Sequence, residues 1–149
     1  MADGYTGKVL RVDLTNEKIS EEPLNKEWAR LHIGGKGLGA RYLFEEQKPG
    51  IDPLSPDNLL MIWTGPFAGT MVPLTSRYVV VTKSPLTGTF LDSYAGGYFA
   101  PELKYAGFDG IIIKGKAKKP VYLWVNDGKA EIRDAKNLWR KDTFKTEEL

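Results

Sequence analysis

The chain has 149 residues, 42% of them hydrophobic and 27% charged, with 21 basic and 19 acidic side chains. This composition excludes an intrinsically disordered chain and predicts one folded domain over residues 1–149. The absence of cysteine and the single histidine, His32, exclude disulfides, cysteine-ligated clusters carried by this chain and histidine-rich metal sites. No apolar run approaches the roughly 18 residues of a membrane helix, and the N-terminus lacks a signal-peptide core, so we expect a cytoplasmic protein with no membrane partner.

The first half of the chain predicts a β-hairpin followed by two helices. Apolar residues alternate over residues 8–14, and a Thr-Asn turn leads into a second strand over residues 18–22. Asn25 is a suitable N-cap for a short helix, which ends at Gly34-Gly35. A second helix should end before a proline and carry three apolar residues on one face: Leu38, Tyr42 and Leu43.

The second half predicts short strands around one helix. This helix spans residues 97–106 and tolerates Pro101 only in its first turn. Asp127-Gly128 favours a tight hairpin turn because the pair accepts positive φ. Strands outnumber helices and most connections resemble hairpins, which predicts the α+β class with antiparallel sheets and a few short helices. The predicted strands of this half are residues 59–64, 78–82, 110–114, 121–125 and 130–133.

Two parts of the sequence resemble each other. Residues 9–28 and 121–139 each contain a strand, a turn, a second strand, a polar stretch and a tryptophan, and a glycine pair opens a helix in each half. The pattern suggests a pseudo-two-fold internal duplication of a strand-rich unit, although the match contains gaps and chance explains it as well.

The segment from Trp63 to Pro101 is depleted in charge. Its 39 residues include only Arg77, Lys83 and Asp92 as charged side chains, where about ten are expected at the average of the chain. The segment is also rich in glycine, proline and threonine. One interpretation is a backbone surface that a ligand approaches closely. The other is a set of buried strands with tight turns, and the two are compatible.

Arg77 and the pair Gly96-Gly97 are the candidate binding residues within this segment. A guanidinium cannot be neutralised and needs acceptors, ideally a carboxylate or phosphate that it binds in bidentate fashion. Glycines before a helix can bring backbone N–H groups against an anion. The alternatives are an arginine that reaches solvent at the end of a strand and a purely structural turn.

Three other sequence features are weaker indications of function. Residues 35–40 fit the loose G-x-G-x-x-A form of a dinucleotide fingerprint, but a helix precedes them, which favours a glycine-rich link between two helices. Residues 114–119 form a basic cluster without the aromatic pattern that stacks on bases, so we expect no nucleic-acid partner. Nothing pairs the nearby carboxylates Asp92, Glu102 and Asp109 for acid–base chemistry.

Several long motifs reveal a resemblance. The sequence contains P-L-S-P-D-N, R-Y-V-V-V-T-K-S-P-L-T-G and G-G-Y-F-A-P-E-L-K-Y-A-G-F-D. Over essentially its whole length the chain resembles the N-terminal domain of the aldehyde ferredoxin oxidoreductase family. The resemblance implies a saddle of antiparallel sheets that holds a tungsten (or molybdenum) bis-pterin beside a [4Fe–4S] cluster. The parent enzyme would oxidise aldehydes to carboxylic acids and pass electrons to ferredoxin, with a substrate that this domain does not fix.

The resemblance also assigns site residues. Arg77 matches the arginine that contacts a pterin and lies towards the cluster, and Gly96 matches a glycine whose backbone contacts the pterin. Ala95 and Gly97 flank this glycine and are expected to bind the cofactor with it. Tyr94 stands where many members have asparagine, whose backbone carbonyl helps to hold a Mg²⁺ that bridges the pterin phosphates. With tyrosine, a carbonyl-based role is retained and a side-chain role is lost.

The family's cluster ligands are cysteines, which this chain lacks. Its last residues read as the start of a helix capped by Asp142 or Thr143. We therefore expect a piece of a longer enzyme, which by itself is inactive and binds no metal tightly, and whose partners are the remaining domains and ferredoxin. The alternatives are a stand-alone anion- or ligand-binding module and a structural or interaction domain that has lost its cofactor.

Overall fold

The computed structural model describes residues 4–149, and within them the chain forms eight strands and four helices. The strands are β1 (Lys8–Asp13), β2 (Lys18–Pro23), β3 (Leu60–Thr64), β4 (Tyr78–Lys83), β5 (Phe90–Ala95), β6 (Gly110–Lys114), β7 (Val121–Asn126) and β8 (Lys129–Asp134). The helices are α1 (Lys26–His32), α2 (Gly35–Glu46), α3 (Phe99–Tyr105) and α4 (Thr143–Glu147). None of the helices between residues 4 and 149 is long and apolar enough to cross a bilayer.

Six strands form one sheet in the order β2-β1-β6-β3-β4-β5, and β7 and β8 pair separately. All pairs are antiparallel except β1 with β6, which run parallel with Val9 opposite Gly110. The α+β class with mainly antiparallel pairing is confirmed. The parallel pair was not expected, because it joins strands that lie far apart in the chain and leaves no local turn signal.

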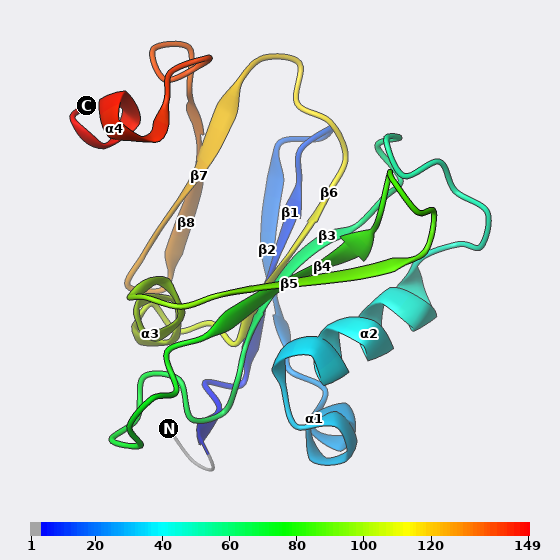
Figure 1. Ribbon diagram of the computed structural model, residues 1–149, viewed down its shortest axis with the longest axis vertical. Helices are drawn as coiled ribbons and strands as arrows, with labels where there is room; N and C mark the ends of the chain where they lie inside the picture. The colour runs from blue at the N-terminus through cyan, green and yellow to red at the C-terminus, as the bar shows by residue number, and fades with distance from the viewer. Residues whose placement is uncertain (1–3) are drawn as a thin grey trace.

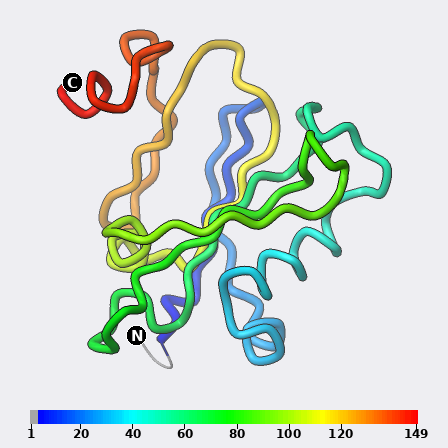
Figure 2. The backbone as a smooth tube through the Cα atoms, in the orientation of Figure 1, coloured from blue at the N-terminus to red at the C-terminus, as the bar shows by residue number. Residues whose placement is uncertain are grey.

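The helices cover the two faces of the six-stranded sheet unequally. Figure 1 shows α1 and α2 on one side, while α3 and the β7–β8 hairpin lie on the other. The described chain begins, at residue 4, at the opposite end of the molecule from its C-terminus (Figure 2). Along β1, the period-2 alternation of a strand directs Val9 towards the helices α1 and α2, and Leu10 and Val12 towards α3 and the hairpin.

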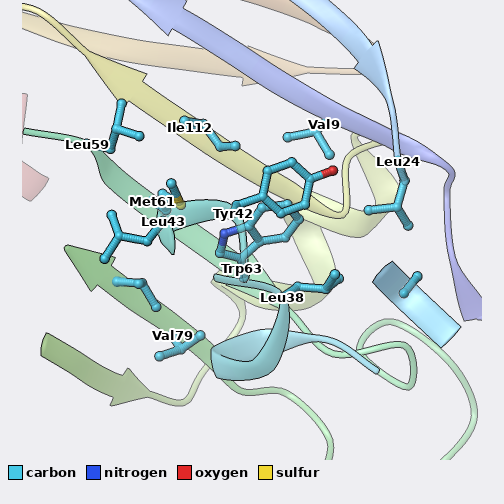
Figure 3. Close-up of a cluster of buried hydrophobic side chains, with 12 residues drawn as sticks. Val9, Leu24, Leu38, Tyr42, Leu43, Leu59, Met61, Trp63, Val79 and Ile112 are labelled. Carbon is cyan, nitrogen blue, oxygen red and sulfur yellow. The ribbon is translucent and has the colours of Figure 1, made fainter. Parts of the chain in front are cut away.

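Trp63 is the centre of the core beneath α1 and α2 (Figure 3). Its indole ring is fully buried and lies 4.7 Å from the ring centroid of Tyr42, which meets Trp28 edge-on at 4.8 Å. Two glycines make room for the indole. A Cβ added at Gly110 would lie 2.5 Å from Cε3 of Trp63, and one added at Gly39 would lie 3.0 Å from Cδ1. Glycine at these two positions therefore allows α2 and β6 to approach the ring.

Several local predictions are confirmed at the level of single contacts. The side chain of Asn25 accepts a hydrogen bond from Trp28 N at 3.0 Å and caps α1, and the side chain of Asp142 caps α4 in the same way through Lys145 N at 2.8 Å. Asp127 and Gly128 have φ of 46° and 76° at the β7–β8 turn. These elements follow directly from capping and turn chemistry.

Two predictions about the second half need correction. The helix expected over residues 97–106 begins only at Phe99, because Gly97 has φ of 96°, outside the helical region. Strand β5 was not predicted. It is an edge strand with a half-exposed, irregular burial pattern, so its sequence lacks the alternation that identifies a strand.

The two hairpins suggested as an internal duplication take different places in the fold. The first hairpin, β1–β2, belongs to the six-stranded sheet, whereas β7 and β8 form a sheet of their own. Trp28 lies in helix α1, but Trp139 lies in a turn. The repeated sequence pattern therefore corresponds to two similar hairpins in different pairing environments.

Candidate functional site

A hollow of about 420 Å³ lies where β4 and β5 approach the turn between α1 and α2. Its walls also include the loop of residues 65–77, which connects β3 to β4. We call it the Arg77 hollow. It is lined by Ile33, Gly34, Gly35, Lys36, Gly37, Trp63, Gly65, Pro66, Phe67, Ala68, Thr75, Arg77, Tyr78, Val79 and Tyr94.

Arg77 lies directly before β4 and is exposed. Among residues 4–149 its guanidinium has no hydrogen-bond or ion-pair partner, in contrast to Arg11, which binds the carboxylates of Glu22 and Glu46. The lining of the hollow contains no carboxylate that could pair with it. The planar fork of N–H donors on Arg77 is therefore not compensated by an anion of this lining.

Lys36 is the other charged residue of the lining. Its ammonium lies 3.4 Å from Asp92 Oδ2, so this charge has a partner on β5. The hollow therefore contains two cations and no anion of its own, with Arg77 the uncompensated one. Such an arrangement favours an anionic or strongly hydrogen-bond-accepting ligand.

Tyr94 reaches the same hollow from the neighbouring strand. The β4–β5 ladder pairs Val79 with Tyr94 and Tyr78 with Ala95, so the end of β5 lies beside the start of β4. The side chain of Tyr94 is half exposed, which leaves it accessible at the wall. The structure thus places Arg77 and Tyr94 in the lining of one hollow, whereas Ala95, which was expected to bind the cofactor with Arg77, does not line it.

Gly96 and Gly97 follow Ala95 and lie outside the lining of the hollow. A Cβ added at either glycine meets no atom within 4 Å, so the backbone there is open on its outer side. Neither N–H donates a hydrogen bond to another residue in the described range 4–149. Gly97 requires glycine for its positive φ, whereas Gly96 does not. The pair is therefore an exposed stretch of backbone with free donors.

The charge-poor segment contains both a buried strand and exposed loops. Val79 and Val81 of β4 are fully buried and belong to the core, as the buried-strand interpretation required. The loops on either side of the strand are open. In loop 65–77, Met71 and Leu74 are 100% exposed and Phe67 is 57% exposed. Apolar side chains gathered on one exposed loop mark a surface that another molecule or another part of the protein covers.

The turn between α1 and α2 is a part of the site that sequence analysis did not assign. Residues 35–40 were expected to form a glycine-rich link between two helices, but they are the first half of α2, and only residues 33–34 separate α1 from α2. Gly34, Gly35 and Gly37 line the Arg77 hollow. A Cβ at Gly34 would lie 3.0 Å from Thr64 O, and one at Gly37 would lie 2.4 Å from His32 O. The density of glycines was the available signal, and it reflects this close approach of backbone segments.

The three carboxylates considered for acid–base chemistry are not assembled into a site. Asp92 pairs with Lys36, and Asp109 pairs with Lys104 at 2.5 Å in the interior. Glu102 is exposed on α3. Within residues 4–149, no three histidine, aspartate or glutamate side chains gather closely enough to hold a metal ion.

The structure is an α+β domain with an open hollow that is lined by glycines and two cationic side chains. A family model described as the N-terminal domain of aldehyde ferredoxin oxidoreductase matches residues 9–149. The chain belongs to this family, as its N-terminal domain.

Curated relatives agree with this assignment. The chain is 49% identical over 146 residues to the tungsten-containing aldehyde ferredoxin oxidoreductase of Pyrococcus horikoshii, a match that covers 98% of the chain and 24% of that protein. It is 43% identical over 138 residues to the WOR-like subunit of an aliphatic sulfonate oxidoreductase of Pyrococcus furiosus, with coverage of 91% and 22%. The chain therefore spans about a quarter of the length of these relatives.

A solved structure has the same fold. The active-site complex BamBC of benzoyl coenzyme A reductase, in complex with 1,5-dienoyl-CoA, superposes with a TM-score of 0.96 at 42% sequence identity. The match covers 99% of this chain and 23% of that one. Relatives named for an aldehyde, for an aliphatic sulfonate and for benzoyl coenzyme A thus share this domain.

Proposed function

We propose that this chain is the domain of a larger tungsten (or molybdenum) oxidoreductase on which a bis-pterin cofactor lies, and that Arg77 is its main polar anchor. In the parent protein this cofactor would be accompanied by Mg²⁺ and a [4Fe–4S] cluster. The reaction would be the oxidation of an aldehyde to a carboxylic acid, with ferredoxin as electron acceptor. Two Pyrococcus relatives named as tungsten-containing aldehyde ferredoxin oxidoreductases support the metal, the reaction and the acceptor.

The single observation that carries the proposal is the uncompensated guanidinium of Arg77. A bis-pterin group presents anionic dithiolene and phosphate groups as well as flat rings rich in hydrogen-bonding atoms. An exposed arginine without a partner in the described chain, beside a lining without carboxylates, fits such a group. The free N–H groups of Gly96 and Gly97, on an open stretch of backbone, fit it as well.

When bound, the metal–pterin group would supply the two-electron redox chemistry. The residues of this chain would hold and orient it. Arg77 would donate hydrogen bonds through its planar fork, and the backbone of Ala95, Gly96 and Gly97 would approach the pterin closely because no side chain projects from the two glycines. The backbone carbonyl of Tyr94 would contribute to the Mg²⁺ site.

The exposed apolar loop 65–77 fits a second part of the proposal. Its side chains Phe67, Met71 and Leu74 would be covered by the remaining three-quarters of the protein and would exclude water from the cofactor. Residues 1–149 would then be one domain of a cytoplasmic enzyme, inactive when isolated because the cysteines for the cluster must come from elsewhere.

The test uses the full-length protein that contains this chain. We expect Arg77→Met to lower the tungsten and pterin content per protein, measured by elemental analysis and by release of the pterin, with an unchanged thermal unfolding temperature. The matched control is Arg30→Met, because Arg30 is also an exposed arginine without an ion pair in the described chain. Equal losses in both variants, or no loss in either, would contradict the proposed role.

A further inference from the structure

Lys104 and Asp109 form a buried ion pair between the end of α3 and the start of β6. Lys104 Nζ lies 2.5 Å from Asp109 Oδ1, and the two side chains are 0% and 3% exposed. Replacing a buried pair by apolar residues of similar size is often neutral or stabilising, so stability alone gives little reason to bury two charges. The segments that the pair connects provide a different reason.

The pair fixes the N-terminal segment of residues 4–7. Asp109 accepts hydrogen bonds from Thr6 N at 3.0 Å and from Gly7 N at 2.7 Å through its two carboxylate oxygens. Lys104 donates a second hydrogen bond to Gly4 O at 2.6 Å. Each charged group therefore holds backbone that is about a hundred residues away in the chain.

Loop 65–77 packs against the same region. The backbone carbonyl of Asp109 accepts hydrogen bonds from Thr64 N at 3.1 Å and Thr64 Oγ1 at 2.9 Å, directly before the loop begins. Within the loop, a Cβ at Gly69 would lie 3.2 Å from Cβ of Lys104, and one at Gly4 would lie 2.4 Å from Pro66 O. Figure 2 shows the loop beside the N-terminal segment.

The glycine pair precedes the helix that carries Lys104, because α3 begins two residues after Gly97 and Lys104 lies near its end. Loop 65–77 therefore packs against Lys104 and against Gly4, which Lys104 binds, and the stretch 95–97 is joined to Lys104 through α3. Directional, charge-assisted hydrogen bonds in the interior define a single arrangement of the segments that they join more narrowly than apolar contacts do.

We propose that Lys104 and Asp109 are positioning residues, which hold loop 65–77 and the Gly96-Gly97 stretch in the arrangement that retains the cofactor. This inference rests on the proposed function. Neither side chain lines the Arg77 hollow, so both residues would act through the backbone that they anchor and not by contact with the cofactor.

The test compares two ion-pair variants in the full-length, cofactor-loaded protein. Lys104→Met removes the ammonium and keeps the length of the side chain. The matched control, Arg11→Met, also breaks a partly buried ion pair, but that pair binds Glu46 at the end of α2 farthest from the hollow. The measurements are amide hydrogen exchange by mass spectrometry, the rate of tungsten loss on dilution and the thermal unfolding temperature. Asp109→Asn, which keeps the shape of the side chain and one acceptor oxygen, is the milder second variant if Lys104→Met does not fold.

We expect Lys104→Met to accelerate exchange in residues 65–76 and 96–98 by about tenfold or more, and tungsten loss along with it. Arg11→Met should leave the exchange rates and the rate of tungsten loss near those of the unsubstituted protein, even if its unfolding temperature falls as much as that of Lys104→Met. Unchanged exchange in these two segments would overturn the inference, and so would faster exchange with unchanged tungsten retention. The Arg77→Met variant separates a failure of the proposed function from a failure of the positioning role. If Arg77→Met retains its tungsten fully, the proposed function fails. If Arg77→Met loses tungsten while Lys104→Met retains it, only the positioning role fails.

Discussion

Arg77 and Tyr94 line the same hollow because β4 and β5 pair with Tyr94 opposite Val79, two residues after Arg77. This register places Tyr94, on β5, beside the start of β4, which Arg77 directly precedes. The glycine pair that follows Ala95 then extends the surface as bare backbone. Arg77 and residues 94–97, which lie apart in the sequence, thus form one open face with one uncompensated positive charge.

The two glycines of this face should respond differently to alanine. Gly96 has no positive φ and an added Cβ meets no atom within 4 Å, so Gly96→Ala should change the free energy of unfolding by less than about 0.5 kcal/mol. Gly97 has φ of 96°, so Gly97→Ala should destabilise the fold by about 1 kcal/mol or more. Urea unfolding of the two variants measures this difference.

Cofactor loading tests the role of Gly96 independently of stability. If the pterin lies against the backbone at Gly96, a methyl group there intrudes on the cofactor, and Gly96→Ala should lower the tungsten content of the full-length protein without a loss of stability. A variant that unfolds more easily while loading remains complete would show that Gly96 serves the turn alone.

Arg77→Lys should keep the charge but lose the planar fork. A hydrogen bond to a charged group typically contributes about 1.5–3 kcal/mol, and a lysine cannot reproduce bidentate geometry. We expect weaker cofactor retention or a shifted potential of the neighbouring cluster in the full-length protein, with the thermal unfolding temperature unchanged. Equal tungsten occupancy, potential and aldehyde oxidation would remove Arg77 from the site.

Gly110→Ala should destabilise the core without touching the proposed cofactor face. Its Cβ would lie 2.5 Å from Cε3 of the fully buried Trp63, and overpacking of this kind typically costs about 1–3 kcal/mol. Gly65→Ala is the control, because its Cβ meets nothing within 4 Å. Thermal unfolding should show a large decrease for the first variant and almost none for the second.

The 149-residue chain should fold when it is expressed alone and should bind no metal tightly. It contains two clusters of buried hydrophobic residues but has no cysteine and a single histidine to bind a transition metal. Elemental analysis of the purified chain checks this expectation. Stoichiometric tungsten or iron after desalting would contradict it.

Local chemistry explains which parts of the fold could be predicted. The cap at Asn25 and the Asp127-Gly128 turn act over a few residues, so their signals are complete in the sequence. Strand β5 and the parallel pairing of β1 with β6 depend on neighbours far away in the chain, and nothing local marks them. The same distinction between local signals and long-range packing applies to the candidate site.

Within the candidate site, the sequence could single out Arg77 and the glycine pair because an isolated charge and bare backbone stand out in a charge-poor segment, and their role in binding stays a prediction. The contribution of the α1–α2 turn to the hollow could not be predicted, because it depends on how α2 packs across β3 and β4. The buried pairing of Lys104 with Asp109 was equally hidden, since a lysine and an aspartate on a short helix and its following loop resemble surface residues until their burial is known.

The most direct test of the central claim is a comparison of amide hydrogen exchange in the full-length protein with and without its cofactor. We predict protection on loading in residues 65–77 and 94–98, with no change in the β7–β8 hairpin, which lies on the other side of the sheet (Figure 1). Protection confined to segments outside this chain, or spread evenly over it, would contradict the assignment of this face to the cofactor.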